Sequence, residues 1–385
     1  METKDFRNEI EGFEEIKKEA AILRKYAFDY SSQKGRAAQI VDLLHPKVLR
    51  LRVAEIQAAS LSAKIFRLVS EGSYLPPFQA GQYINLTVDV GQVRTSRPYS
   101  ISSPPNQVGY YEIAVRRAAD GFVSNFLLDE LQVGDSLEST SPAGNFYYNP
   151  LVHGQDLVFL AGGSGITPFM SMIRETTDRG LERKIHLLYG SQRPEDIIYS
   201  KELKELTERN GNFKMDIVIS DPPPGYRGLT GFLTADLIRK QAGNVSGKTF
   251  YLCGPEAMYS FCLKELEALK VPRAKIRTEV FGPPKDVTAQ PGWPAEVPGE
   301  RQFQVNYKGE KTVSAKAAEP LMNSLERTGI VLPASCRSGE CSLCRTKLAT
   351  GKVFQPPWVR LRKSDRVFGY VHPCVAYPLS DVELA

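Results

Sequence analysis

The 385-residue sequence contains no long apolar run, and nowhere do apolar residues approach the roughly 20 in succession that a membrane-spanning helix requires. Residues 1–30 open with acidic and basic side chains in place of an apolar signal core. The charge is also nearly balanced, because 49 Lys and Arg face 44 Asp and Glu. No excess of one sign therefore points to nucleic acid. These absences predict a cytoplasmic protein with no membrane span and no nucleic-acid partner.

Histidine is scarce, and the four histidines are scattered without forming a ligand pair, so cysteine is the main candidate metal ligand. Four of the six cysteines follow a C-x4-C-x2-C-x29-C spacing, namely Cys336, Cys341, Cys344 and Cys374. A disulfide framework would suit a short secreted chain, whereas this long chain favours free thiolates that bind metal. The spacing fits a plant-type [2Fe-2S] cluster. Structural zinc is the alternative, but zinc sites favour two C-x2-C pairs and one such pair occurs here.

Length and residue pattern predict several domains. Residues 1–48 form a helical N-terminal arm, in which apolar residues recur at helical spacing among charges. Short strand-like runs separated by turn residues fill 49–150 and predict a small antiparallel barrel, whereas in 151–281 apolar runs alternate with helical segments, as in a parallel α/β sheet. Residues 282–300 hold five prolines and three glycines, which predicts a linker that lets the terminal domain swing. Residues 301–385 form a compact cysteine-bearing module.

A glycine-rich segment, Gly162-Gly163-Ser164-Gly165, follows an apolar run and precedes a helical stretch. A strand, a glycine loop and a helix in this order place a pyrophosphate against backbone N–H groups and a helix dipole. The dinucleotide fingerprint G-x-G-x-x-G is not met, so a tight strand-to-helix turn is the alternative.

Four short motifs occur in a fixed order: Arg97-Pro98-Tyr99-Ser100, Gly121-Phe122-Val123-Ser124, the glycine loop, and Cys253-Gly254-Pro255. Together they resemble the ferredoxin-NADP reductase family over residues 49–281. The loop from Cys336 to Cys344 is similar to the cluster loop of plant-type ferredoxins, so the chain resembles three-part reductases ordered flavin, nicotinamide, [2Fe-2S]. The resemblance implies a multidomain fold with an antiparallel β-barrel FAD domain, an α/β parallel-sheet NAD(P) domain and an α+β, β-grasp-like ferredoxin domain.

The resemblance also implies roles for single residues in flavin binding. Arg97 would hold the flavin pyrophosphate, Tyr99 would pack on the isoalloxazine, and Ser100 would lie near flavin N5. Gly121 and Ser124 would open a helix that favours FAD over FMN.

Other roles concern the nicotinamide and the closing of the flavin site. Thr167 would contact the nicotinamide end and Cys253 would face its reacting carbon. Glu279 and Phe281 resemble the acidic and aromatic residues that close over the flavin, although Phe281 continues here into the linker. The candidate catalytic residues are Ser100, Cys253 and Glu279. The candidate cofactor-binding residues are Arg97, Pro98, Tyr99, Ser100, Gly121, Ser124, Gly162, Gly163, Gly165, Thr167, Ser191, Arg193, Cys253, Gly254, Pro255 and Phe281.

The choice between NADH and NADPH depends on the residues after the apolar run 185–189. Ser191 and Arg193 are possible phosphate ligands there, and an acidic residue for the ribose is missing from this strand end. A single arginine offers few ligands to the 2′-phosphate of NADPH, which slightly favours NADH.

The predicted function is electron transfer from NAD(P)H through FAD and the cluster to a separate protein, such as an oxygenase, a corrinoid protein or a cluster enzyme. One alternative is a permanent electron-entry subunit that assembles through residues 1–48. Another, a redox-silent NAD(P)H sensor, fits poorly with an intact four-cysteine set.

The charge of the terminal module suggests how the acceptor docks. Residues 301–385 contain thirteen Lys and Arg against seven Asp and Glu. Arg337 and Arg345 lie beside the cluster ligands, and a second basic run includes Arg362 and Lys363. These bases predict an acidic docking patch on the acceptor, the alternative being an ordinary solvated surface.

Overall fold

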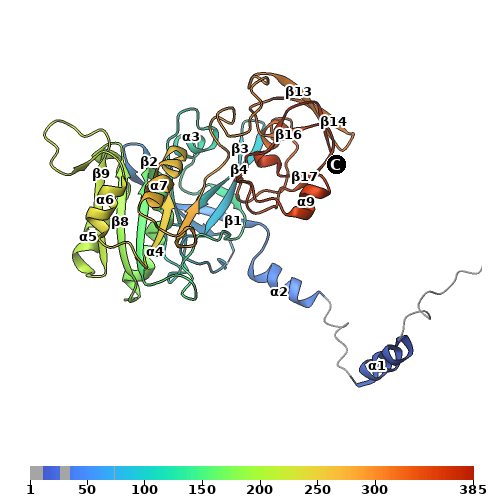
Figure 1. Ribbon diagram of the computed structural model, residues 1–385, viewed down its shortest axis with the longest axis horizontal. Helices are drawn as coiled ribbons and strands as arrows, with labels where there is room; N and C mark the ends of the chain where they lie inside the picture. The colour runs from blue at the N-terminus through green and yellow to red at the C-terminus, as the bar shows by residue number, and fades with distance from the viewer. Residues whose placement is uncertain (1–11, 27–34, 73) are drawn as a thin grey trace, which may run out of the picture. The chain divides into compact units, whose positions relative to one another are not determined.

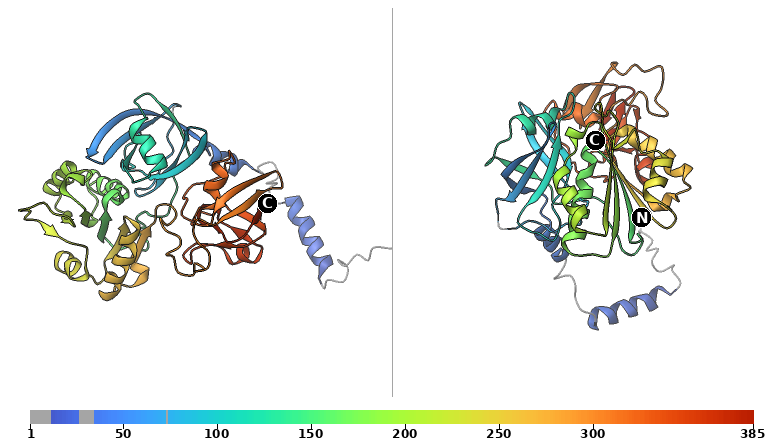
Figure 2. Two further views of the ribbon diagram at one scale, coloured as in Figure 1. Left: turned by 90° about the horizontal axis from the view of Figure 1, so that it is seen from above. Right: turned by 90° about the vertical axis from the view of Figure 1, so that its left-hand side faces the viewer.

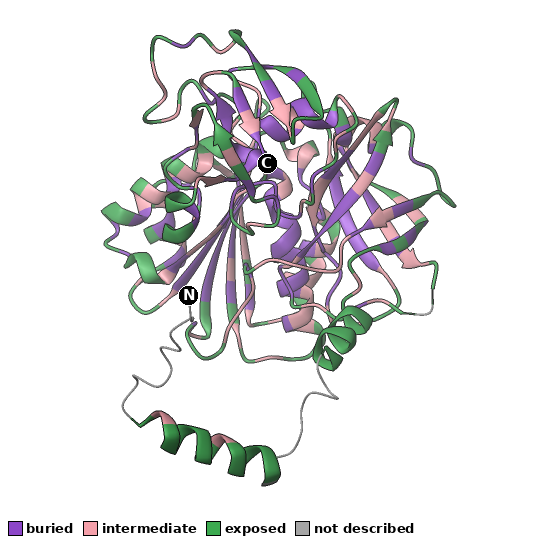
Figure 3. Ribbon diagram, turned by 90° about the vertical axis from the view of Figure 1, so that its right-hand side faces the viewer, coloured by how far each residue is buried: buried purple, intermediate pink, exposed green. Residues whose placement is uncertain are grey.

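The computed structural model describes residues 12–26, 35–72 and 74–385, and the chain divides into two units, residues 1–46 and 47–385 (Figure 1). The first unit contains the helices α1, Phe13–Tyr26, and α2, Arg36–Leu44. Apolar side chains such as Ile16 and Leu23 are exposed on α1, and Figure 3 shows this helix exposed along most of its length. None of the helices in the described part of the chain has the length and apolar character needed to cross a bilayer.

The second unit begins with a six-stranded antiparallel sheet in the order β4-β3-β6-β1-β2-β5. A bridge between Ile101 and Ile113 joins the two edge strands, so the sheet closes into the predicted barrel. The helix α3 covers the barrel core with Val123, Leu127 and Leu128. The elements are β1 Leu49–Ser60, β2 Ala63–Ser70, β3 Tyr83–Val90, β4 Val93–Ser100, β5 Tyr111–Arg116, α3 Phe122–Asp129 and β6 Ser136–Ser139.

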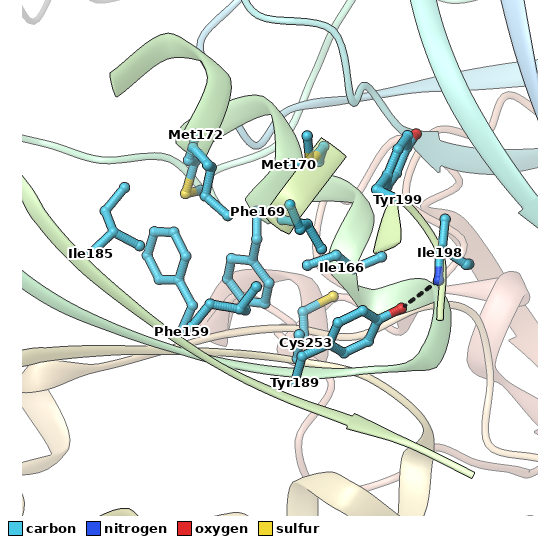
Figure 4. Packing of buried hydrophobic residues seen from close by; sticks show 14 of the residues in the cluster. Phe159, Ile166, Phe169, Met170, Met172, Ile185, Tyr189, Ile198, Tyr199 and Cys253 are labelled. Carbon is cyan, nitrogen blue, oxygen red and sulfur yellow. Dashed lines mark hydrogen bonds between the residues drawn. The ribbon is translucent and has the colours of Figure 1, made fainter. Parts of the chain in front are cut away.

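A parallel sheet follows, in the order β10-β9-β8-β7-β11-β12. Both of its faces are covered: the rings of Phe159 and Phe169 stack on one side with centroids 4.6 Å apart (Figure 4), while Phe250 and Cys262 pack on the other. Burial on both faces explains why its strands read as continuous apolar runs. The elements are β7 Asp156–Gly162, α4 Ile166–Asp178, β8 Lys184–Ser191, α5 Ser200–Arg209, β9 Phe213–Ile219, β10 Leu229–Thr230, α6 Ala235–Ala242, β11 Thr249–Cys253, α7 Glu256–Ala268 and β12 Ile276–Glu279.

The C-terminal module has a mixed five-stranded sheet in the order β14-β13-β19-β15-β17, in which β13 and β19 are parallel. Its helix α8 packs Leu321 and Leu325 into the same core as Val305 of β13. This arrangement confirms the β-grasp-like prediction. The elements are β13 Gln302–Tyr307, β14 Lys311–Lys316, α8 Leu321–Glu326, β15 Thr346–Thr350, β16 Val353–Phe354, α9 Lys363–Val367, β17 Tyr370–Val371, β18 Tyr377–Pro378 and β19 Val382–Leu384.

Residues 282–300 contain neither helix nor strand, yet they differ from the extended swinging spacer that composition suggested. Val287 and Val297 are buried, and the Trp293 ring packs against Phe354 of the C-terminal module with centroids 5.3 Å apart. Near its start, the backbone N–H of Lys285 donates to the Glu256 carboxylate on α7 at 3.0 Å. Proline and glycine exclude regular elements here, but they leave valine and tryptophan free to pack.

Candidate functional site

The motif Arg97-Pro98-Tyr99-Ser100 forms the end of β4, an edge strand of the barrel sheet that tolerates proline. The guanidinium of Arg97 donates to the Thr95 hydroxyl at 2.8 Å and to the Ser96 carbonyl at 2.7 Å, both neutral oxygens. Burial, together with the nearby Arg337 cation, lowers the pKa of Arg97 to about 10. A cation held in this way is stabilised by a bound anion, so the site fits the predicted flavin pyrophosphate.

The candidate catalytic residues, predicted to lie at the flavin and the nicotinamide, come together from three strands. Ser100 and Glu279 are both buried, and the Ser100 hydroxyl lies 3.5 Å from the Glu279 carboxylate although 179 residues separate them. Cys253 pairs with Glu279 across β11 and β12. Burial raises the pKa values of the Cys253 thiol and the Glu279 carboxyl well above their usual ranges, which favours the neutral thiol and carboxylic acid.

Two aromatic residues predicted to flank the flavin differ in exposure. Burial raises the pKa of Tyr99, which packs against the barrel core, whereas Phe281 is 37% exposed. Their predicted stacking on the flavin remains a prediction.

The helix α3 begins at Gly121, which adopts an extended backbone without a side-chain cap. A Cβ at Gly121 would lie 2.3 Å from the Ser124 hydroxyl, so glycine lets this side chain fold back over the first turn. A helix N-terminus of this kind attracts anionic groups, in keeping with its predicted role toward FAD.

The glycine loop connects β7 to α4 through a short turn, Gly163–Gly165. A Cβ at Gly165 would lie 2.2 Å from the Cys253 carbonyl oxygen, and one at Gly162 would lie 2.8 Å from Pro255. Glycine therefore allows the two predicted nucleotide loops to approach each other closely. The Tyr189 hydroxyl donates to the Gly163 carbonyl at 2.9 Å and fixes the loop from the neighbouring strand.

A Gly165→Ala substitution should therefore destabilise the protein by about 1–3 kcal/mol and weaken NAD(P)H binding, because backbone atoms must move to admit the methyl group. Thermal unfolding and titration with NADH measure the two effects. Gly211→Ala is the matched control, since a Cβ there meets nothing within 4 Å. Equal stability and nucleotide affinity in Gly165→Ala and wild type would contradict this account of the loop.

The same loop lines a cavity of about 550 Å³ that also involves Gly190, Ser191 and Pro255. Thr167 is buried, and its hydroxyl donates to the Ser164 carbonyl at 2.7 Å within the helix start. Glycine-lined space beside a helix N-terminus is suited to a dinucleotide.

Sequence reasoning missed an acidic residue, Asp221, which follows the cavity-lining Ser220 in the chain. The Arg193 guanidinium donates to the Asp221 carboxylate at 3.0 Å, and the Asp221 backbone N–H donates to the Gln192 carbonyl. Asp221 follows β9, which lies parallel to β8 with Ser191 opposite Ile219. The signal in the sequence is the acidic residue after the apolar run 215–219, one strand away from the loop that carries Ser191 and Arg193.

The four cysteines predicted to bind metal lie in two pairs. The sulfurs of Cys344 and Cys374 are 3.4 Å apart, and the Cys336 sulfur accepts the backbone N–H of Cys341 at 3.3 Å. Hydrogen bonds from the Cys341 thiol and from backbone N–H groups lower the pKa of Cys336. Cys341 is exposed, whereas the other three are buried.

Within residues 12–26, 35–72 and 74–385, no group of three or more His, Cys, Asp or Glu converges as a single metal ion requires. A [2Fe-2S] cluster has two irons and takes four cysteine ligands, so the two cysteine pairs supply the ligand number that it needs.

The backbone of the cluster loop is tightly shaped. Arg337, Gly339 and Ser342 have positive φ angles of 51°, 77° and 59°. A Cβ at Gly339 would lie 2.7 Å from Val375, and the imidazole Nδ1–H of His372 donates to the Gly339 carbonyl at 3.0 Å. His372 thus orients the loop backbone.

The C-terminal module lies beside the barrel (Figures 1 and 2), and the residues just before the cluster loop contact strand β3. The hydroxyls of Tyr83 and Ser335 are 3.3 Å apart, and the Asn85 amide donates to the Ala334 carbonyl at 2.9 Å. Tyr83 pairs with Ser100 in the β3–β4 register. The structure therefore brings the first cysteine of the cluster loop and the end of β4 to one place.

Comparisons with known proteins agree with this geometry. Family models match an oxidoreductase FAD-binding domain over residues 50–148, an oxidoreductase NAD-binding domain over 159–264 and a 2Fe-2S iron-sulfur cluster binding domain over 303–379. A glycine betaine monooxygenase reductase subunit of Pseudomonas aeruginosa is 27% identical over 86% of this chain and 93% of the relative. NADH-cytochrome b5 reductase 1 of Dictyostelium discoideum is 31% identical over 64% of this chain and 86% of the relative.

Among solved structures, a phthalate dioxygenase reductase matches with a TM-score of 0.66 and 25% identity, covering 88% of this chain and 97% of that one. That protein is a modular structure for electron transfer from pyridine nucleotides to [2Fe-2S]. The chain therefore belongs to the ferredoxin-NADP reductase family, and it combines the FAD-binding and NAD-binding domains with a C-terminal 2Fe-2S domain.

Proposed function

We propose that this protein passes electrons from NADH through FAD and a [2Fe-2S] cluster to a separate oxygenase. The contact of the cluster loop with β3, where Tyr83 meets Ser335, carries the proposal, since it adjoins the two predicted redox sites. Two relatives are named as reductase components of monooxygenases, for glycine betaine and for 3-ketosteroid, which supports an oxygenase as acceptor. The free cysteines suit a reducing compartment, and the cytoplasm remains our prediction.

The residues of the chain divide the chemistry between them. When bound, the nicotinamide would supply hydride, the flavin would convert electron pairs into single electrons, and the cluster would accept these singly. Arg97 and the start of α3 would hold the flavin phosphates, and the glycine loop would hold those of the nucleotide. Ser100, with its hydroxyl beside the Glu279 carboxyl, would supply a hydrogen bond at the flavin edge that faces Cys253.

A preference for NADH follows from the pairing of Arg193 with Asp221. Both side chains are exposed, at 64% and 54%, so the pair leaves little free positive charge for a 2′-phosphate. The Asp221 carboxylate would repel that phosphate and accept hydrogen bonds from the ribose hydroxyls of NADH.

We expect Asp221→Asn to raise kcat/KM for NADPH about tenfold, corresponding to about 1.4 kcal/mol, because Arg193 is released to meet the phosphate. Steady-state reduction of ferricyanide with each nucleotide measures this change. The control is Asp236→Asn, which breaks an exposed pair with Arg239 on α6. A wild-type preference for NADPH of about a hundredfold or more would refute the assignment.

The acceptor would dock on exposed bases near Cys341. Arg362 and Lys363 are exposed, whereas Arg337 is 3% exposed and paired with Glu326, so it takes no part in a basic surface. Arg345 pairs with Asp365. Arg360 lies 3.7 Å from the Glu340 carboxylate, so we infer that the docking bases are Arg362, Lys363 and Arg366, and that they meet an acidic patch on the acceptor.

Anaerobic stopped-flow absorption with NADH tests the function directly. Flavin absorption should fall first, cluster absorption should follow, and both should recover when an oxidised oxygenase partner is added. Purified protein without flavin and iron-sulfur absorption would refute the proposal and favour a redox-silent nucleotide sensor.

The alternative of a permanent electron-entry subunit rests on exposed apolar side chains of α1 and α2, including Leu23 and Leu43. It predicts a sharp, large complex from native extract on size exclusion that survives high salt. A reductase eluting alone at moderate salt would exclude it.

A further inference from the structure

A buried threonine on β4, the strand that carries the predicted flavin-binding residues, connects the barrel to the ferredoxin module. Thr95 lies on β4 two residues before Arg97, so both side chains project from the same face of the strand. Its hydroxyl donates its one hydrogen to the Glu326 carboxylate at 2.8 Å and accepts from Arg97 at 2.8 Å. The hydroxyl's one hydrogen and one of its lone pairs are therefore in use, and the Arg337 guanidinium donates to the same oxygen at 3.5 Å.

The partners of Thr95 in the module include a buried ion pair beside the cluster. Arg337 follows Cys336 directly in the chain, and its two guanidinium nitrogens donate to the Glu326 carboxylate at 2.6 and 2.9 Å. The side chains of both residues are less than 5% exposed, and Asn323 accepts a further hydrogen bond from Arg337 at 2.9 Å. A buried pair with this bidentate geometry is rigid. Loss of any hydrogen-bond donor to its carboxylate would leave the buried negative charge less well compensated.

We propose that Thr95 is a positioning residue that fastens the cluster loop to the flavin strand through Glu326 and Arg337. Thr95, Arg97, Glu326 and Arg337 together form what we call the Thr95 junction. The inference rests on the proposed function, since the junction would serve electron transfer from the flavin to the cluster. Arg97 at one end is the predicted pyrophosphate ligand, and Cys336 adjoins the other end, so the junction spans the two cofactor sites.

Loss of the hydroxyl separates the two halves of the junction. In Thr95→Val, Glu326 would keep its bonds to Arg337, and Arg97 would keep the Ser96 carbonyl. What would be lost are the hydrogen bond from Thr95 to Glu326 and the longer one that Thr95 accepts from Arg337 at 3.5 Å, while the contacts of Tyr83 and Asn85 with the module remain. Because a hydrogen bond to a charged group in a buried setting is worth a factor of about ten in equilibrium, the docked state should be depleted about tenfold.

Two measurements on the full-length, cofactor-loaded chain test the junction. Hydrogen–deuterium exchange should show faster exchange at residues 93–100 and 334–338 in Thr95→Val and in Glu326→Gln. In anaerobic stopped flow, cluster reduction should slow about tenfold relative to flavin reduction in the same variant, because electron transfer falls steeply with separation. Thr95→Ser keeps the hydroxyl and should restore both properties.

The matched control is Asp365→Asn, which neutralises a buried carboxylate paired with Arg345, next to the ligand Cys344. It disturbs another ion pair beside a predicted ligand, one whose arginine is 39% exposed, and Thr95 with its barrel contacts is left intact. Exchange and cluster reduction in Thr95→Val that match wild type, or an equal effect of Asp365→Asn, would overturn the proposal. A wild-type flavin that passes no electrons to the cluster would instead refute the proposed function, and the exchange data would still decide whether the junction joins the domains.

Discussion

Replacing Cys341 with serine should remove the cluster and abolish electron delivery to the acceptor, while NADH still reduces the flavin. Cys341 is one of the four predicted ligands, and its loss leaves one sulfur pair incomplete. The barrel and the parallel sheet have hydrophobic cores of their own, so the predicted flavin and nucleotide sites should persist. Iron and sulfide content, visible absorption and ferricyanide reduction by NADH measure the three consequences.

Cys262→Ala is the control for this substitution, because Cys262 is a free cysteine buried on α7, outside the predicted ligand set. It should keep the cluster. Loss of flavin together with the cluster in Cys341→Ser would show that the domains fold as one unit, an outcome for which the contact between Tyr83 and Ser335 would supply the cause.

Reversing Arg362 and Lys363 to glutamate should slow electron transfer to the native acceptor tenfold or more at low salt. The substitutions place negative charge where the proposed acidic patch would dock. Transfer by the wild type should also slow as salt rises, since the Debye length is about 8 Å at physiological ionic strength. Stopped-flow mixing of reduced reductase with oxidised acceptor across a salt series measures both effects.

The matched control reverses Lys201 and Lys204, two exposed lysines on α5 of the parallel-sheet domain. It changes the net charge equally on another domain. Reduction of FAD by NADH should be unchanged in both double variants. If electron transfer to the acceptor responds neither to salt nor to the reversal at Arg362 and Lys363, these bases have no docking role and belong to an ordinary solvated surface.

Much of the fold was predictable because local pattern and tertiary structure agree. The apolar runs at 157–160, 185–189, 215–219 and 250–252 became the parallel strands β7, β8, β9 and β11. Strands buried on both faces must be continuously apolar, so their pattern identifies the class of sheet. The cysteine spacing likewise reflects a local loop geometry.

The parts that could not be predicted depend on neighbours distant in sequence. Arg337 reads as a surface base beside a ligand, and its burial against Glu326 becomes evident when α8 packs under the loop. Asp221 belongs to a different strand from Arg193, so the parallel register alone makes them neighbours.

Residues 282–300 show the limit of composition as a guide. A high content of proline and glycine indicates that the backbone forms neither a regular helix nor a regular strand. It carries no information about which surface Val287, Trp293 and Val297 meet.

Cys341 is exposed, in contrast to Cys336, which is buried next to the barrel contact, so in the proposed function electrons would enter the cluster on one side and leave it on another. An acceptor that approaches on the side of Cys341 need not displace the contact with β3. NADH could then reduce the reductase, and the acceptor could oxidise it, within one complex. The two proteins would not need to dissociate between successive electrons. A reductase cross-linked to its acceptor through Lys363 is accordingly expected to sustain many turnovers.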